Sequence, residues 1–152
     1  MSGIDGQSDE TIRAVLTGTR RIALVGASAK SWRPSFGVMR FLLERGFDVT
    51  PVNPNLAGQA IHGRAVVAGL DEAGPLDMVD LFRNAARVGP LVDQAVRLGA
   101  RCVWMQLGVI DTAAAARARE AGVTVIMDRC PVIEDRRLGI GLPLRQSPSA
   151  LE

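Results

Sequence analysis

A stretch of small and polar residues, GASAKSWRPS at positions 26–35, holds the first side chains suited to bind a ligand. It follows an apolar run, and Gly26 permits the tight turn that brings a diphosphate close to backbone N–H groups. The dinucleotide-binding pattern G-x-G-x-x-G has Ser28 and Ser31 in place of its second and third glycines. Ser28 offers a hydroxyl donor, and Arg33 precedes a helix start, where a guanidinium can form two parallel hydrogen bonds with phosphate. The stretch predicts an anion-binding loop, with an ordinary strand-to-helix turn as the alternative.

The next apolar run ends in VTPVNPN at positions 49–55, which bears on the choice of nucleotide. NAD-binding folds usually carry an Asp or Glu here, whose carboxylate accepts hydrogen bonds from the ribose hydroxyls. This segment has no acid, and Asn53 lies between Pro51 and Pro54. An ordinary NAD site is therefore disfavoured, while NADP with an arginine partner stays open. Asn53 is either a fixed amide contact or part of a proline-locked turn.

Two later apolar runs also end in side chains suited to contact a ligand, in LFRN at 81–84 and VWMQLG at 103–108. Arg83 follows its run directly and is expected at the carboxyl edge of a parallel sheet. Gln106 is an amide that needs a hydrogen-bond partner, and Gly108 lets a ligand approach the backbone. These positions extend the candidate site beyond the first loop.

Other chemically active residues form no catalytic or metal-binding set. His62 is the only histidine, and Cys102 and Cys130 lack the paired spacing of a zinc site or a disulfide framework. The chain has neither a G-x-S-x-G elbow nor a G-x-x-x-x-G-K-[ST] loop. For Cys130, a buried free thiol is favoured over a reactive one.

The bulk composition suits a single domain, 1–152, with one sizeable core at about 10–138 and a loose tail at 139–152. The net charge is +2, the basic residues are spread along the chain, and aromatic residues make up 4%, so we expect no nucleic-acid partner. No apolar run approaches the roughly 18 residues of a membrane span, and the polar N-terminus is not a signal peptide. A cytoplasmic protein without membrane contact is expected.

Short apolar runs alternate with segments of helical spacing, which is typical of a parallel sheet covered by helices on both faces. We expect Trp104 and Met105 in its core rather than in a ligand wall. Ligands of such sheets bind beyond the carboxyl ends of the strands. The expected strands lie at 22–25, 47–52, 78–82, 102–105 and 123–127, with at most a short one near 65–67. The expected helices lie at 9–17, 34–45, 88–98 (Pro90 in its first turn) and 112–120 (capped by Asp111), with one or two helical turns at 131–138.

Five motifs, taken together, resemble a known family. In order and spacing, the chain is similar over about 10–138 to the small stand-alone CoA-binding proteins, which share their fold with the N-terminal domain of the succinyl-CoA synthetase α subunit. Where that family often has a tyrosine after Arg-Pro-Ser, this chain has Phe36. The motifs are VGASAKSWRPSFGV, PVNPNLAGQAIHG, VDLFRN, GARCVWMQLGVID and DRCPVIEDRRL.

The resemblance implies a Rossmann-like, doubly wound, mostly parallel sheet of five to six strands that binds coenzyme A or an acyl-CoA. It places the diphosphate at the first loop, the nucleotide beside the second, and the pantetheine arm at the fourth. The catalytic histidine and ATP-grasp parts of the synthetases are absent at this length, so binding without catalysis is the leading interpretation. The residues it implies are Gly26, Ala27, Ser28, Arg33, Asn53, Pro54, Phe82, Arg83, Gln106 and Gly108.

Two other interpretations stay open. One is an NADP-type Rossmann oxidoreductase with an unusual cofactor loop. The other is the CoA-binding subunit of a larger acyl-CoA ligase, with an ATP-grasp chain as its partner. The sequence leaves open whether the chain forms a homodimer, and it does not identify an acyl group.

Arg33→Ala tests the assignment of the first loop. A charge-assisted, partly desolvated contact with phosphate is worth about 1.5–3 kcal/mol, or roughly 10- to 150-fold in affinity. We expect calorimetry to show CoA binding weakened by that factor, with the melting temperature of the unliganded protein nearly unchanged. Arg117→Ala, on the predicted solvated face of the alanine-rich helix, should change neither. If Arg33→Ala binds CoA like the parent, the arginine is only a surface residue.

Overall fold

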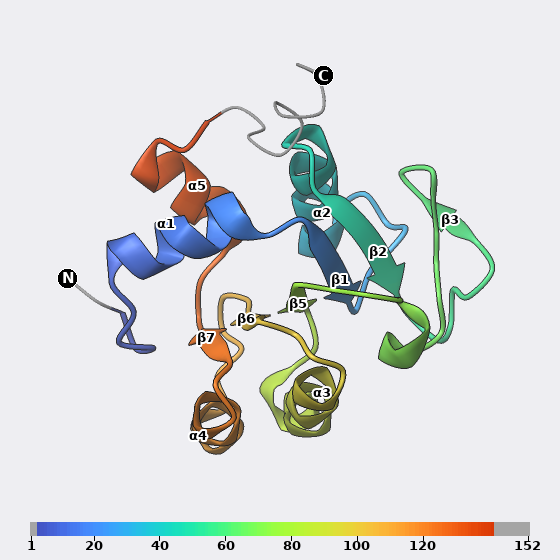
Figure 1. Ribbon diagram of the computed structural model, residues 1–152. Coiled ribbons are helices and arrows are strands. Elements are labelled where there is room, and N and C mark those ends of the chain that lie inside the picture. The colour runs from blue at the N-terminus through green and yellow to red at the C-terminus, as the bar shows by residue number, and fades with distance from the viewer. Residues whose placement is uncertain (1–2, 142–152) are drawn as a thin grey trace.

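A five-stranded sheet with helices on both faces forms the body of the fold (Figure 1). The computed structural model describes residues 3–141. Most of the expected tail at 139–152 lies outside the described residues. The expected Rossmann-like architecture, with a doubly wound parallel sheet, is confirmed.

All five strands of the sheet run parallel, in the order β2-β1-β5-β6-β7. The chain first moves outward from β1 to β2 and then returns to the other side of β1, so the winding direction reverses between β1 and β5. The central strands β5 and β6 are buried along their whole length, as expected of a sheet covered on both faces. The strands are β1 (Arg21–Val25), β2 (Asp48–Val52), β5 (Met78–Leu81), β6 (Cys102–Met105) and β7 (Thr124–Ile126).

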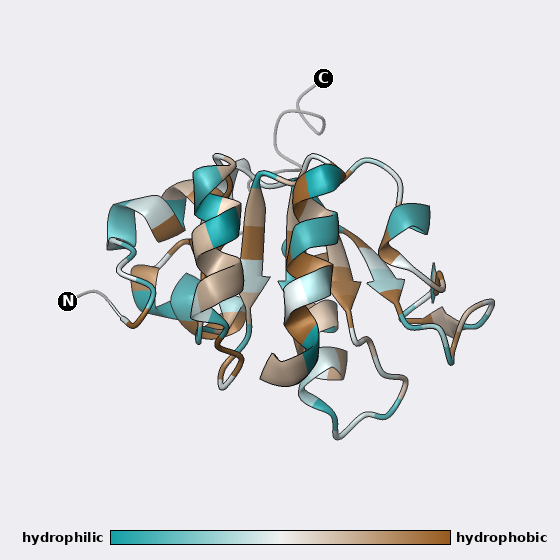
Figure 2. Ribbon diagram, turned by 90° about the horizontal axis from the view of Figure 1, so that it is seen from below, coloured by the Kyte–Doolittle hydropathy of each residue, from teal (hydrophilic) through white to brown (hydrophobic). Residues whose placement is uncertain are grey.

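The helices form one layer on each side of the sheet, and alternate residues of each strand face opposite layers. Val79 and Leu81 pack in the cluster that includes α3 and α4, which Figure 2 shows in front of the sheet. Met78 and Trp104 pack in the cluster on the other side, and Trp104 and Met105 are fully buried, as predicted. The helices are α1 (Asp9–Gly18), α2 (Pro34–Glu44) and α5 (Pro131–Leu138) on one side and α3 (Ala85–Arg97) and α4 (Thr112–Glu120) on the other.

Several predicted boundaries are confirmed. The side chain of Asp111 caps α4, because its Oδ1 accepts a hydrogen bond from the Ala114 N–H at 3.0 Å. Pro34 occupies the first turn of α2, and the expected turns at 131–138 form α5. No helix within residues 3–141 is long and apolar enough to cross a membrane.

Two features differ from the prediction. α3 begins before position 88, because extended Asn84 starts the helix and its carbonyl accepts the Arg87 N–H at 2.9 Å. Pro90 therefore lies inside the helix rather than in its first turn, where it removes one backbone hydrogen bond. The connection after β2 also forms a small hairpin and a short turn of helix, namely β3 (Ala60–Ile61), β4 (Arg64–Ala65) and η1 (Leu70–Glu72).

Arg117 lies on an exposed face of α4, but it is not free of partners. Its Nε and Nη2 donate to Asp93 of α3 at 3.0 and 3.2 Å. Exposed pairs of this kind make a small contribution to stability that salt screens. Arg117→Ala is thus a control for ligand binding and not for melting temperature.

The N-terminal segment covers the outer edge of β7 through Asp5. The Asp5 side chain is fully buried, and its carboxylate accepts hydrogen bonds from the backbone N–H groups of Gln7 and Met127 at 2.9 and 3.0 Å. Arg129 donates to both of its oxygens, at 2.9 and 3.1 Å. Gln7 Nε2 also donates to the Val125 carbonyl at 2.9 Å. The edge strand therefore presents few free backbone groups to another chain.

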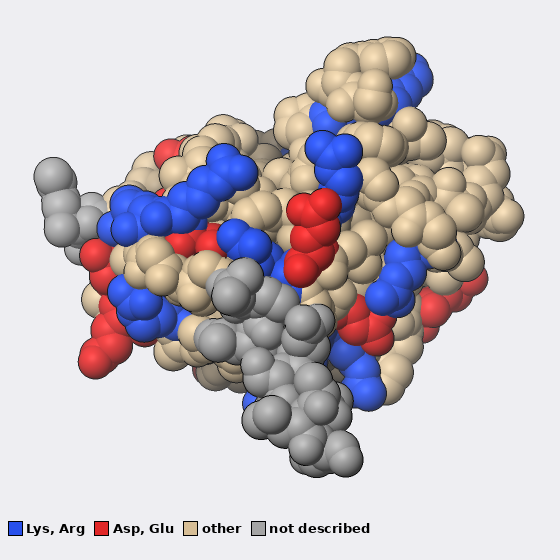
Figure 3. All heavy atoms as spheres, turned by 90° about the horizontal axis from the view of Figure 1, so that it is seen from above, with Lys and Arg blue, Asp and Glu red and all other residues tan. Residues whose placement is uncertain are grey.

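Ion pairs continue from Arg129 across the layer that carries α1 and α5. Arg129 and Arg137 both pair with Glu134, at 3.1 and 2.7 Å, and Arg137 also pairs with Asp9 at 2.8 Å. Figure 3 shows basic and acidic side chains close together on this face. The pairs tie the first helix to the last one.

Asp5→Asn should lower the free energy of unfolding by about 3 kcal/mol at neutral pH, because it breaks a buried ion pair. Burial alone would raise the pKa of Asp5, but the hydrogen bonds from Arg129, Gln7 and Met127 outweigh it and hold the pKa below its ordinary value. The stabilisation is therefore present above the unfolded-state pKa of about 4 and is lost as the pH falls through the folded-state pKa. Urea unfolding from about pH 7 to about pH 3 measures this loss.

In that experiment the Asp5→Asn curve should be flatter in acid than the parent curve. Asp71→Asn, which changes an exposed carboxylate of η1, is the matched control and should follow the parent. Parallel acid slopes for Asp5→Asn and the parent would contradict the role of this carboxylate.

Candidate functional site

The carboxyl ends of all five strands open onto one pocket of about 1030 Å³. Residues from the loop after each strand line it, so the candidate segments found in the sequence converge on one place. Pro54 is the one predicted residue outside the lining, because the turn presents its neighbours Asn53 and Asn55 instead. The predicted residues that line the pocket are Gly26, Ala27, Ser28, Arg33, Asn53, Phe82, Arg83, Gln106 and Gly108.

The pocket is centred where the winding reverses, and there Gly26 allows two loops to approach each other. Its φ is +87°, and a Cβ at this position would lie 2.8 Å from the carbonyl oxygen of Phe82. The N–H groups of Gly26 and Ala27 both point to the Val52 carbonyl, at 3.0 and 3.3 Å. These hydrogen bonds fix the start of the first loop to the end of β2, and the pocket opens beyond it.

Asn53 joins the first and second loops. Its Nδ2 donates to the Ala27 carbonyl at 2.8 Å, and its Oδ1 accepts the Asn55 N–H at 2.8 Å. Both ends of the Asn53 amide are thus hydrogen-bonded to protein backbone. Of the two interpretations of the sequence here, the structure favours a positioning turn, with Asn53 shaping the pocket wall.

All charged side chains that line the pocket are cations: Lys30, Arg33, Arg83 and Arg87. None of the four forms an ion pair with another described residue, although Lys30 lies 5.8 Å from the ring centroid of Trp32. Four unpaired cations without a facing acid make a site for an anion. Arg33 and Arg83 were predicted, and Lys30 and Arg87 were missed.

The first turn of α2 supplies further groups suited to an anion. Arg33 is the N-cap and makes no side-chain cap hydrogen bond, and the first turn contains no acid. Ser35 is only 3% exposed and lines the pocket, yet its hydroxyl has no hydrogen-bond partner among the described residues. Free N–H groups and the helix dipole at such a terminus favour negative charge. Ser35 was not predicted as a site residue, although the helix start at Pro34 was a usable signal.

The far end of the pocket is formed by the ends of β6 and β7. The Gly108 N–H donates to Asp128 Oδ1 at 2.7 Å, so this group is not free for a ligand. Cys130 is a buried free thiol, as predicted, and it lines the pocket, as Gln106 does. Residues 3–141 contain no cluster of three or more His, Cys, Asp or Glu side chains placed to hold a metal ion.

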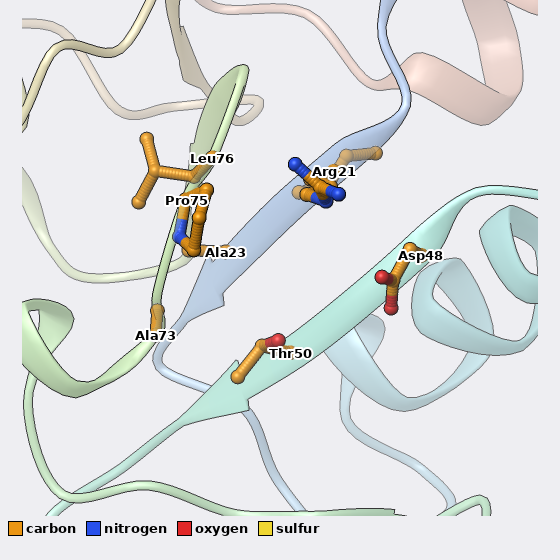
Figure 4. A pocket seen from close by; sticks show the side chains of 8 residues that line it. Arg21, Ala23, Asp48, Thr50, Ala73, Pro75 and Leu76 are labelled. Atoms are coloured by element: carbon orange, nitrogen blue, oxygen red, sulfur yellow. The ribbon is translucent and has the colours of Figure 1, made fainter.

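Two smaller cavities lie near the amino ends of the strands and lack this set of groups. One of about 130 Å³ is shown in Figure 4, where Arg21, Asp48 and Thr50 surround it. Asp48 already pairs with Arg64 at 2.6 Å. The other, of about 280 Å³, lies between α1 and the sheet edge. The carboxyl edge is therefore the better candidate for a binding site.

Comparisons with known proteins cover most of the chain. The family model described as CoA binding domain matches residues 20–136. The uncharacterized protein YneT of Bacillus subtilis (strain 168) is 32% identical over 123 residues, which are 81% of this chain and 90% of that protein. A hypothetical protein from Pyrococcus horikoshii OT3 has a TM-score of 0.86 and 39% identity, covering 93% of this chain and 98% of its own. A Thermus thermophilus structure has a TM-score of 0.82 and 34% identity, covering 87% and 99%.

Gly26→Ala should destabilise the protein more than Gly58→Ala. The two glycines have nearly the same φ, +87° and +88°, so both substitutions carry the left-handed strain of about 1–2 kcal/mol. Only at position 26 would the new Cβ meet backbone, at 2.8 Å from the Phe82 oxygen, whereas nothing lies within 4 Å at Gly58. We expect an additional loss of about 1–3 kcal/mol in urea unfolding. Equal losses would mean that the approach of the two loops is not a constraint.

Proposed function

The chain belongs to the CoA binding domain family, and from this premise we propose that it binds coenzyme A or an acyl-CoA at the carboxyl edge of its sheet. The observation that carries the proposal is the pocket with four cations, no acid and contributions from every strand end. The pocket has no complete acid–base or nucleophilic set, so we propose a binding module without catalysis of its own.

The distribution of groups in the pocket suits the parts of coenzyme A. The diphosphate would lie at Gly26–Ser28 and the first turn of α2, where Arg33 and the Ser35 hydroxyl are available. Arg83 and Arg87 would meet the remaining phosphate charge, including the adenosine 3′-phosphate. Arginine suits phosphate because its planar fork donates two parallel hydrogen bonds.

The shape of the site suits an elongated ligand. It extends from the loop after β2 to Cys130 after β7, across four inter-strand spacings of about 4.8 Å, or about 19 Å in total. The nucleotide would lie at the β2 end, beside Asn53 and Asn55, with Phe82 in the middle. The pantetheine arm would then extend toward Gln106, Gly108 and Cys130.

An ordinary NAD site is the weaker alternative at this edge. The end of β2 has no carboxylate for the ribose hydroxyls, and the amide of Asn53 is already bound to backbone at both ends. NADP would still bring a phosphate for the cations, so it belongs in any test of the site.

Calorimetric titration with CoA, dephospho-CoA, ATP, NAD and NADP separates these ligands. We expect CoA to bind most tightly and dephospho-CoA more weakly, because the latter lacks the 3′-phosphate. Tighter binding of NAD than of CoA would overturn the proposal. Tighter binding of NADP, together with hydride transfer to small carbonyl compounds, would favour an oxidoreductase. Co-purification with an ATP-grasp chain would favour a ligase subunit.

Arg87→Ala should weaken CoA binding by about 10- to 150-fold, because a charge-assisted contact with phosphate is worth about 1.5–3 kcal/mol. Arg97→Ala is the matched control, since Arg97 is an exposed residue at the opposite end of the same helix and does not line the pocket. Calorimetry with CoA measures both variants. Equal affinities for Arg87→Ala and Arg97→Ala would remove Arg87 from the site.

A further inference from the structure

Asp80 is a carboxyl group at the centre of the sheet. It lies on β5, between Leu24 of β1 and Trp104 of β6 in the strand register, and it is fully buried. Trp104 does not donate a hydrogen bond to Asp80, because its indole Nε1 donates to the Arg129 carbonyl at 2.8 Å. Among the described residues, the side-chain amide of Gln106 is the hydrogen-bonding group within reach of the carboxyl.

Stability does not explain a carboxyl group in this position. Burial raises the pKa of Asp80 well above its ordinary value, and no cation compensates for the loss of water. Burial and the nearby Asp80 carboxylate also raise the pKa of the Cys102 thiol on the neighbouring strand. A buried acid with one amide partner destabilises a fold relative to a neutral side chain of the same shape. The residue is therefore better explained by what it does to Gln106.

Asp80 determines how the Gln106 amide is turned. With the amide nitrogen toward Asp80, Nε2 donates to both carboxylate oxygens, at 2.8 and 3.1 Å. For an ionised Asp80 the opposite orientation is excluded, because the amide oxygen would face the carboxylate oxygens, which repel it. The two hydrogen bonds from Nε2 in turn favour the ionised form. Gln106 is only 6% exposed and lines the ligand pocket, so the oxygen turned away from Asp80 is the end left for the pocket.

We propose that Asp80, as a carboxylate, is a positioning residue that holds Gln106 with its amide oxygen toward the ligand, so that this end of the pocket selects a hydrogen-bond donor. The inference rests on the proposed function, in which the pantetheine arm with its amide N–H groups lies here. An acceptor buried at this point favours an amide-bearing arm and penalises a ligand that presents another acceptor, because one buried group would then be left unpaired.

Asp80→Asn tests the inference with little change of shape. An asparagine can donate or accept, so it bonds to Gln106 in either orientation and no longer fixes the amide. We expect affinity for CoA to fall about two- to tenfold, the effect of one neutral hydrogen bond. Affinity for adenosine 3′,5′-bisphosphate, which lacks the pantetheine arm, should not change. The melting temperature should be equal or higher, because a neutral group replaces a buried acid.

A purely structural role predicts the reverse pattern: lower stability and equal losses for both ligands, which would overturn the proposal. Unchanged affinity for both ligands would overturn it as well. Should Asp80→Asn not fold, Asp80→Leu is compared in the same way. If the parent itself binds neither CoA nor the bisphosphate, the proposed function fails, and this inference falls with it.

A spectroscopic readout needs no ligand. In a nitrogen–proton NMR spectrum of the parent, the Gln106 side-chain NH₂ should give a separate, slowly exchanging signal, because it donates to a buried carboxylate. Gln106→Leu assigns that signal by removing it, and Asp80→Asn should shift it toward the ordinary amide position. An ordinary, rapidly exchanging Gln106 signal in the parent would overturn the proposed orientation.

Discussion

The approach of Gly26 to the Phe82 carbonyl is the constraint on which the site depends. A residue with a Cβ would place that atom 2.8 Å from this oxygen. The loops after β1 and β5 therefore come this close only because position 26 is a glycine. This contact lies between β1 and β5, where the winding of the sheet reverses and the connections diverge to opposite faces. Because these connections leave toward opposite faces, a pocket opens beyond the strand ends, and the side chains that follow the strands line it. Asn53 fixes the remaining side by bonding the Ala27 carbonyl.

The pocket differs from the outer helix layer in its acids: the lining contains none, whereas the outer layer has several carboxylates beside its arginines. Over the outer layer of α1, α2 and α5, Arg45, Arg129 and Arg137 pair with carboxylates, and Arg137 bonds both Asp9 and Glu134. The lining of the pocket contains four cations and no acid. Like charges gathered in one lining create a positive potential that favours an anion there. Selective absence of acids at one edge is therefore a stronger indication of function than the small net charge.

The sequence predicted the elements well, because apolar runs, glycines and caps are local signals. Gly26 and Asp111 were placed correctly on that basis, and the strand ends led to most of the pocket lining. Lys30 and Arg87 were missed because their role depends on which way a loop and a first helical turn face, which spacing alone does not give. The start of α3 was misplaced because Pro90 resembles a first-turn proline, while packing extends the helix before it.

Long-range contacts were the least predictable part, and they connect the N-terminus to the pocket. Three consecutive residues after β7 have separate partners: Asp128 bonds the Gly108 N–H, Arg129 binds buried Asp5, and Cys130 lines the pocket. Asp128 has a φ of +60°, a conformation that aspartate tolerates better than most residues and that aims its carboxylate at Gly108. Asp5 holds this segment at its middle, and the segment contributes Cys130 to the pocket lining. The packing of the N-terminal segment therefore supports backbone that borders the pocket, a connection over 124 positions of the sequence that no local pattern indicates.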